Sequence, residues 1–131
     1  MKNPDIGVRC ILVVEDEPAI CEICLKVLND ESFEIDIATN GKMAEDKLQE
    51  RDYDLILIDI RTPVMNGTEL YKYITNMIPE MAGRVIFTTG DVMAGGIQDF
   101  IEQAGRPFMP KPFTPRELRN IVRETLKQIE Q

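Results

Sequence analysis

The chain alternates between short apolar runs and longer segments with amphipathic spacing. Apolar runs of strand type lie at residues 10–14, 33–37, 55–58, 85–89 and 108–109. Helix-type segments follow these runs, and this alternation predicts repeated β-α units with a parallel sheet. Strands this apolar are buried on both faces, so helices are expected on both sides of the sheet. The predicted fold class is α/β, with a single doubly wound five-stranded parallel sheet and five helices.

The predicted helices differ in how clearly their ends are marked. They cover a segment that begins at Pro18, then residues 42–50, 68–76 and 94–103, and a last segment at 115–129. Gly95 and Gly96 lie inside the fourth segment, where each glycine costs on the order of 1 kcal/mol relative to alanine, so this helix is expected to be loosely held. Thr114 and Glu117 predict a capping box at the start of the fifth helix.

Carboxylates follow two of the predicted strands. Glu15 and Asp16 come directly after the first strand, and Asp59 comes directly after the third. In open α/β sheets, ligands bind beyond the carboxyl ends of the strands, so these side chains are expected to share one crevice. Like charges at ~4 Å repel by roughly 4 kcal/mol at an effective dielectric near 20, which predicts a bound cation. Oxygen ligands in a chain without histidine favour Mg²⁺.

Length and charge limit the number of domains and the classes of function that the chain can have. With 131 residues and 44% hydrophobic content, the chain is expected to be one domain, residues 1–131, with a core from about 8 to 129. A net charge of -8, from 15 basic and 23 acidic residues, argues against direct nucleic-acid binding. No apolar stretch approaches membrane-spanning length and no signal peptide is recognisable, so a cytoplasmic domain without membrane contact is expected.

Three cysteines suggest reduced thiols. Their number is odd, and a chain with a good core does not need a disulfide framework. Two residues separate Cys21 from Cys24 inside a predicted helix, and there is no second pair of cysteines and no histidine to complete a zinc site. Cys24 is therefore expected in the core and Cys21 at the surface or edge of the helix.

Four motifs lie at the expected strand ends and in the expected order. They are Val-Val-Glu-Asp-Glu-Pro at 13–18, Asp-Ile-Arg-Thr-Pro-Val-Met-Asn-Gly at 59–67, Thr-Thr-Gly-Asp at 88–91 and Lys-Pro-Phe at 111–113. With these motifs the chain resembles the receiver domain of two-component response regulators over essentially its whole length. The resemblance implies a flavodoxin-like fold with strand order 2-1-3-4-5. It also implies a phosphoacceptor domain of a bacterial phosphorelay.

The resemblance implies a role for each polar residue at the strand ends. Asp59 is the implied phosphoacceptor, which attacks the phosphorus of a phosphohistidine. Glu15, Asp16, Asp59 and the backbone carbonyl of Arg61 would hold Mg²⁺, and Lys111 would supply a second cation. A carboxylate nucleophile needs the phosphoryl charge neutralised, and a metal with a lysine does this. Such a domain promotes its own phosphorylation and dephosphorylation without being a turnover enzyme by itself.

Other residues carry the implied switch. Thr89 would donate its hydroxyl to a phosphoryl oxygen, and Phe108 would be the aromatic residue whose rotamer follows it. Arg61 and Asp91 occupy the positions that tune phosphate lifetime in the family, and this pair is expected to bridge the site. The bond before Pro112 is expected to be cis, because X-Pro bonds have only a small trans preference.

Two further positions concern the loop and the sheet edge. Thr62 stands where the family commonly has Met, which affects packing of its loop more than the chemistry. Pro110 removes a backbone donor from the fifth strand and predicts an edge position for it.

The implied partners are a sensor histidine kinase or phosphotransfer domain, and a downstream protein at the face formed by the fourth helix, fifth strand and fifth helix. The segment 105–113 is most similar to receivers at the C-terminus of hybrid sensor histidine kinases. A stand-alone response regulator and a receiver excised from a transcriptional regulator remain open as the parent architecture.

Two alternative functions also remain open. A degenerate receiver would act as a phosphorylation-independent interaction module, although the acceptor, metal and lysine positions are all filled. An aspartate-nucleophile phosphatase of the haloacid-dehalogenase kind needs a second aspartate two residues after the nucleophile. Arg61 stands at that position, which argues against this chemistry.

Overall fold

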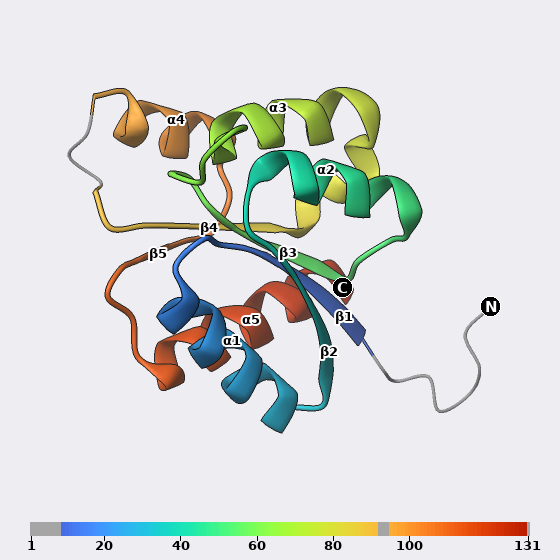
Figure 1. The fold of residues 1–131 in the computed structure, drawn as a ribbon, viewed down its shortest axis with the longest axis vertical. Coiled ribbons are helices and arrows are strands. Elements are labelled where there is room, and N and C mark those ends of the chain that lie inside the picture. The colour runs from blue at the N-terminus through green and yellow to red at the C-terminus, as the bar shows by residue number, and fades with distance from the viewer. Residues whose placement is uncertain (1–8, 92–94, 131) are drawn as a thin grey trace.

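The computed structural model describes residues 9–91 and 95–130, and Figure 1 shows their arrangement. The elements are β1 (Arg9–Val14), α1 (Pro18–Asp30), β2 (Phe33–Ala38), α2 (Gly41–Glu50), β3 (Leu55–Asp59), α3 (Gly67–Met77), the 3₁₀ helix η1 (Pro79–Arg84), β4 (Val85–Thr89), α4 (Ile97–Ala104), β5 (Phe108–Pro110) and α5 (Pro115–Glu130). The five strands pair in parallel in the order β2-β1-β3-β4-β5. The predicted fold class is confirmed.

Helices cover both faces of the sheet, as the apolar strands predicted. Figure 1 shows α1 and α5 on one side and α2, α3 and α4 on the other. Alternate side chains of the central strands point to opposite faces of the sheet. Leu57 packs with α1 and α5, whereas Ile56 and Ile58 pack with α2 and α3. Cys24 is fully buried in the layer beneath α1, and the half-buried Cys21 lies nearer the surface, as expected. None of the described helices is long and apolar enough to cross a membrane.

The fourth helix begins later than predicted. α4 starts at Ile97, because its N-cap residue Gly96 has a φ of +82°, which no helix interior accommodates. The two glycines therefore precede the helix, and the predicted start at Ala94 lies outside the described residues. The expected core start near residue 8 also lies outside them. The short helix η1 was not predicted.

Capping residues place the helices at the sheet edge that carries the motifs. Thr114 and Glu117 exchange the predicted capping-box bonds at 2.8 and 3.1 Å. A second capping box, not predicted, joins Asn66 and Glu69 at the start of α3. Gly67 follows directly, and a Cβ there would lie 2.6 Å from Ile60 Cα, so only glycine lets α3 start against the end of β3. These caps fix the end of the loop that follows Asp59 and the end of the loop that carries Lys111.

An aromatic cluster ties α4 to the sheet. The ring of Phe100 on α4 lies 5.1 Å from Phe87 on β4 and 6.0 Å from Tyr71 on α3, and Tyr71 and Phe87 are 5.2 Å apart. All three pairs meet edge to face, a geometry that contributes about 0.5–1.5 kcal/mol per pair beyond burial. No side chain of α4 is fully buried. The helix is therefore held mainly through Phe100 and a few half-buried neighbours, which agrees with the expected loose attachment.

A buried hydroxyl in β4 gives a testable prediction about stability. Thr88 is 2% exposed, and among the described residues its Oγ1 has no hydrogen-bond partner. An unpaired buried polar group costs about 1–3 kcal/mol, and valine has nearly the same shape as threonine. We expect Thr88→Val to raise the free energy of unfolding by about 1 kcal/mol in urea titrations.

The control is Thr125→Val on α5. Thr125 is equally buried, but its Oγ1 donates to the Ile121 carbonyl at 2.7 Å. This substitution is expected to lower the free energy of unfolding. Equal effects of the two substitutions would contradict the assignment of Thr88 as an unpaired group.

Candidate functional site

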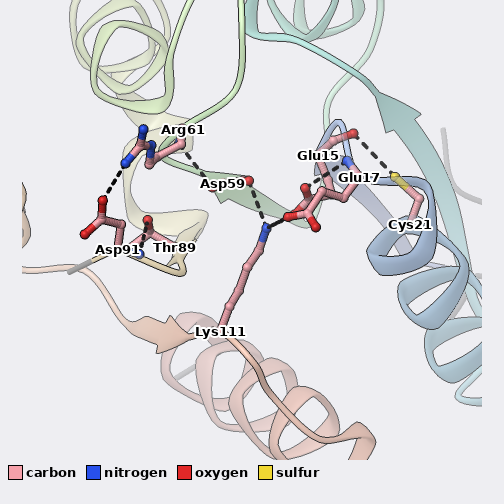
Figure 2. A network of polar contacts seen from close by, with 8 residues as sticks. All are labelled: Glu15, Glu17, Cys21, Asp59, Arg61, Thr89, Asp91 and Lys111. Atoms are coloured by element: carbon pink, nitrogen blue, oxygen red, sulfur yellow. Dashed lines mark hydrogen bonds and ion pairs between the residues drawn. The ribbon is translucent and has the colours of Figure 1, made fainter. Parts of the chain in front are cut away.

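The carboxyl ends of the strands bring the predicted site residues to one edge of the sheet. Glu15 follows β1, Asp59 is the last residue of β3, Thr89 is the last residue of β4, and Lys111 follows β5. The parallel register sets these ends side by side, with Val14 opposite Ile58 and Asp59 opposite Thr88. Figure 2 shows Lys111 meeting Glu15 and Asp59 at this edge, with Thr89 nearby beside Asp91.

Lys111 lies at the centre of this crevice. Its Nζ is 2.8 Å from Glu15 Oε1, 2.9 Å from Asp59 Oδ2 and 3.0 Å from Glu17 Oε1 (Figure 2). Glu15 and Asp59 are only 3% and 4% exposed, so two of these carboxylates are held away from bulk water. One ammonium faces three carboxylates, which leaves the cluster with an excess of negative charge.

The acidic residue that joins Glu15 and Asp59 is Glu17, and this differs from the predicted ligand set. Oxygens of Glu15, Glu17 and Asp59 all lie within 4.8 Å of one another, whereas the exposed Asp16 does not belong to this group. The Glu17 N–H donates to Glu15 Oε2 at 3.1 Å, so the chain folds back and brings the Glu17 carboxylate over Lys111. The sequence analysis considered only Glu15 and Asp16, although Glu17 is the third acidic residue of the same run.

Burial and charge shift the pKa values in the crevice. Burial raises the pKa of Glu15 to about 7, opposed by its hydrogen bond with Lys111 and reinforced by the charge of Asp59. Burial disfavours the charged form of Lys111, but hydrogen bonds to Glu15, Asp59 and Glu17 outweigh it and raise the Lys111 pKa above its ordinary value. Lys111 is therefore a permanent cation, whose single charge does not fully compensate the carboxylates.

A chain of polar contacts closes the other side of the crevice. The Arg61 N–H donates to Asp59 Oδ1 at 3.1 Å, and the Arg61 side chain pairs with Asp91 at 2.6 Å. The Asp91 N–H donates to Thr89 Oγ1 at 3.2 Å (Figure 2). The predicted Arg61–Asp91 bridge is present, and it links the Asp59 strand to the Thr89 strand.

The remaining predicted residues lie around this site. Phe108 is half-buried in β5 and stands opposite Phe87 in the register. The bond between Lys111 and Pro112 is cis, the isomer that was expected. Pro110 ends β5, which is an edge strand as predicted. Thr62 is buried in the loop after β3, where its Oγ1 donates to the Met65 carbonyl at 3.2 Å.

The donor set fits a hard divalent cation. Every converging acidic ligand offers carboxylate oxygen, and no histidine is present in the chain. Mg²⁺ prefers oxygen ligands, commonly one or two carboxylates together with water and phosphate. The uncompensated charge around Lys111 gives the physical reason for a second cation in this crevice.

The chain belongs to the response regulator receiver domain family, whose family model matches residues 11–123. Members of this family are the receiver domains of two-component response regulators, so the predicted class is confirmed. A solved CheY-like receiver from Methanospirillum hungatei is 30% identical, covering 95% of this chain and 98% of that one with a TM-score of 0.85. The alternatives of a degenerate module and a phosphatase are not favoured.

Other relatives differ in what surrounds the receiver. The transcriptional regulatory protein ResD of Bacillus subtilis is 34% identical over 92% of this chain and 49% of its own length. The DNA-binding regulator MtrA of Mycolicibacterium smegmatis is 31% identical over 92% and 51%. The receiver of a sensor histidine kinase from Pseudomonas aeruginosa, which holds a magnesium ion in its active site cleft, is 25% identical with a TM-score of 0.82 over 92% and 99%. The chain spans about half the length of the curated relatives it matches.

Proposed function

We propose that Asp59 accepts a phosphoryl group from a phosphohistidine on a sensor histidine kinase or a phosphotransfer domain. The observation that carries this proposal is the contact between the buried Asp59 carboxylate and Lys111 Nζ at 2.9 Å, in a crevice at the carboxyl ends of the strands. The family membership of the chain supports the same role. The reaction breaks the P–N bond of the phosphohistidine as the Asp59 carboxylate forms a P–O bond.

The residues of the chain prepare this transfer by position and charge. The Arg61 N–H fixes one oxygen of Asp59 and Lys111 pairs with the other, so the carboxylate is held in one orientation. Lys111 also places a permanent positive charge where the phosphoryl oxygens arrive. Thr89 is proposed to turn its hydroxyl from Asp91 toward a phosphoryl oxygen after transfer.

The proposed metal is Mg²⁺, held by Glu15, Asp16, Asp59 and the Arg61 carbonyl. When bound, the ion neutralises charge on the phosphoryl group during its transfer. Glu17 lies in the carboxylate cluster, so it is the alternative to Asp16 as a ligand of the metal ion. Substitutions at these two residues distinguish the two ligand sets.

The parent protein is the finer part of the proposal. We propose a receiver joined to a sensor histidine kinase in the cytoplasm of a bacterium. Two observations support this architecture. Residues 105–113 resemble the matching segment of hybrid sensor histidine kinases, and the whole chain is similar to the kinase receiver from Pseudomonas aeruginosa. The relatives ResD and MtrA represent the other architecture, in which a receiver belongs to a DNA-binding regulator. The length of the complete gene decides between them.

The first test is binding of beryllofluoride, a phosphoryl analogue, together with Mg²⁺. Both ligands bind the folded chain, so the Tm is expected to rise, since a ligand at 100 times its Kd contributes about 2.7 kcal/mol. Asp16→Ala is expected to remove the effect of Mg²⁺, and Glu17→Ala is expected to retain it. The reverse result would assign the metal to Glu17. An unchanged Tm of the wild-type chain with both ligands would leave a degenerate receiver as the better description.

The phosphorylated state is proposed to be read at the face formed by α4, β5 and α5. Phe87 precedes Thr89 by two residues on β4 and therefore points to the same face, where its ring contacts Phe100 of α4. A hollow of about 990 Å³ lies between α3 and α4, lined by Tyr71 and Phe100 among others. A small movement of Thr89 can thus bias a weakly anchored helix that has space beside it.

Amide hydrogen exchange tests this route. Beryllofluoride with Mg²⁺ is expected to change exchange by about fivefold or more in peptides covering Ile97–Ala104 and β5, and little in α1. Thr89→Val is expected to remove the change in α4. Thr88→Val is the matched control, because neighbouring residues of a strand point to opposite faces. If Thr89→Val responds like the wild-type chain, the phosphoryl group is read by another route.

A further inference from the structure

Two asparagines of the chain stand directly before a glycine. They are Asn40 before Gly41 and Asn66 before Gly67, and each asparagine is the N-cap of a helix, α2 or α3. Asparagine followed by glycine is the pair most prone to spontaneous deamidation, because glycine has no side chain to shield its backbone nitrogen. Both pairs are vulnerable by sequence, and the folded structure decides whether each one reacts.

Deamidation requires the glycine nitrogen to reach the asparagine side chain. After a base removes its proton, the Gly41 nitrogen attacks Asn40 Cγ. The N–Cγ bond forms as the side-chain amide leaves as ammonia, which takes up the proton. Water then opens the resulting cyclic imide. Cleavage of the new N–Cγ bond gives aspartate, and cleavage of the original peptide bond gives isoaspartate, whose main chain runs through the side-chain carbon.

The two asparagines have the same backbone conformation. Asn40 has a ψ of 168° and Asn66 a ψ of 174°, both extended, and the glycine that follows each one is buried. Each Oδ1 accepts a hydrogen bond from a backbone N–H of its helix, that of Met43 at 2.8 Å and that of Glu69 at 3.0 Å. The remaining contacts therefore decide which asparagine is free to react.

Asn66 and the glycine after it are held by three further hydrogen bonds. The Gly67 N–H donates to the Ile60 carbonyl at 2.9 Å, so the nitrogen that would attack is engaged. Thr68 Oγ1 donates to Asn66 Oδ1 at 2.7 Å, and the Asn66 N–H donates to Glu69 Oε1 at 2.9 Å. All three have to break before the side chain and the nitrogen can meet.

Asn40 lacks these restraints. Within residues 9–91 and 95–130, no hydrogen bond engages the Gly41 N–H, and the Asn40 side chain is held by its cap bond alone. We propose that Asn40 is a site of spontaneous deamidation in the folded chain, whereas Asn66 is protected, and that isoaspartate at residue 40 loosens the loop after Asp59. Neither step depends on the proposed role of Asp59.

Hydrogen bonding and exposure predict opposite orders of reactivity. Each hydrogen bond that has to break slows the reaction by about fivefold, so Asn40 is expected to react at least about tenfold faster than Asn66. Exposure alone would favour Asn66, because Asn66 is exposed and Asn40 is half-buried. The order of the two rates is therefore a direct test.

The two products differ in their effect on α2. Aspartate caps a helix as well as asparagine does, and its charge is favourable at a helix N-terminus. Isoaspartate adds a methylene to the main chain directly before Gly41, where a Cβ would already overlap the Met65 carbonyl. That carbonyl accepts the Thr62 hydroxyl at 3.2 Å, inside the loop of residues 60–66. A shift of Gly41 therefore reaches the loop that begins directly after Asp59.

The experiment follows both sites in the wild-type chain at physiological temperature and pH. Peptide mapping by mass spectrometry measures the deamidated fraction at Asn40 and at Asn66 against time, and methylation by an isoaspartyl methyltransferase reports the isoaspartate. Asn40 is expected to convert at least about tenfold faster than Asn66. The control is the same chain unfolded in urea, where the hydrogen bonds are absent and the two sites should convert at similar rates.

Thr68→Val tests the protection of Asn66. This variant loses the hydroxyl that donates to Asn66 Oδ1, so deamidation of Asn66 is expected to rise by about fivefold while that of Asn40 stays unchanged. Thr75→Val is the matched control on the same helix. The Thr75 hydroxyl donates to the Lys72 carbonyl at 3.0 Å, and its loss is expected to change neither rate.

The effect on the loop is measured on chains converted at residue 40. They carry an added negative charge and are separated by ion exchange, and Asn40→Asp represents the aspartate product alone. This variant should keep the Tm of the wild-type chain. The isoaspartyl chain should melt about 5 °C lower, as expected for loss of an N-cap. Its amide exchange in residues 60–66 should be about fivefold faster.

The possible results are distinct. Equal rates at the two sites of the folded chain, or faster conversion of Asn66, overturn the proposal. No conversion of Asn40 in the folded chain, over a time in which the unfolded chain converts, also overturns it. An isoaspartyl chain with the Tm and loop exchange of Asn40→Asp would overturn the proposed effect on the loop.

Discussion

Asp59→Asn is expected to abolish incorporation of the phosphoryl group from acetyl phosphate. The amide lacks the nucleophilic carboxylate oxygen, and no other carboxylate in the crevice combines burial with contacts to both Lys111 and Arg61. Intact-mass spectrometry should show one added phosphoryl group on the wild-type chain and none on the variant. A change from full to undetectable labelling would identify Asp59 as the residue that accepts the phosphoryl group.

The matched control is Asp46→Asn on α2. Asp46 is exposed and pairs only with Lys42 among the described ion pairs, so its loss leaves the crevice unchanged. Labelling of this variant is expected to equal that of the wild-type chain. A phosphoryl group found on Asp59→Asn would place the acceptor elsewhere, with Glu15 and Glu17 as the first residues to examine by peptide mapping.

Most of the fold could be predicted from the sequence because its signals are local and repeated. The apolar runs at 55–58 and 85–89 match β3 and β4 to within one residue. Thr114 and Glu117 marked the start of α5 through a capping box that forms as expected. The strand order followed from the family resemblance and not from these patterns, since hydrophobic periodicity does not specify which strands pair.

Positive φ values were the feature of the backbone that the sequence did not predict. Gly96 was assigned to a helix interior, whereas its positive φ makes it the cap that precedes α4. Val64 has an even less expected conformation, because nothing in the local sequence predicts a positive φ for a valine. The Val64 turn lies against Gly41 of α2, where a Cβ would overlap the Met65 carbonyl, and a local reading of the sequence does not contain such a contact.

The sequence predicted the residues at the centre of the candidate site, but it did not predict that Glu17 would join them. Asp59, Glu15 and Lys111 meet because each one ends or follows a parallel strand, a consequence of the fold class. The position of Glu17 depends on how the three-residue connection to α1 turns back on itself, through the Glu17 N–H and the Glu15 carboxylate. Such a turn is set by the side chains it joins, so the sequence did not show that Glu17 would lie with Glu15 and Asp59, and Asp16 as a metal ligand stays a prediction.

Lys111→Met is expected to lower the rate of labelling at Asp59 by about 100- to 1,000-fold. Loss of one preorganised group that stabilises developing charge typically costs this much. Methionine keeps most of the length and apolar volume of the lysine stem, so packing against the crevice wall is preserved. The rate should be measured with acetyl phosphate at saturating Mg²⁺, by the mass of the labelled chain against time.

The same substitution separates the electrostatic roles of Lys111 from a purely structural one. Without the ammonium, Glu15, Glu17 and Asp59 face one another with no cation between them, and each pair at ~4 Å repels by about 1 to 4 kcal/mol depending on the local dielectric. The Tm of Lys111→Met without Mg²⁺ should therefore fall, and added Mg²⁺ should raise it by more than in the wild-type chain. Lys42→Met, which removes an exposed lysine on α2, should change neither labelling nor the response to Mg²⁺. A labelling rate within about threefold of the wild-type chain would show that Lys111 does not stabilise the transferred phosphoryl group, since a donor of that kind contributes far more.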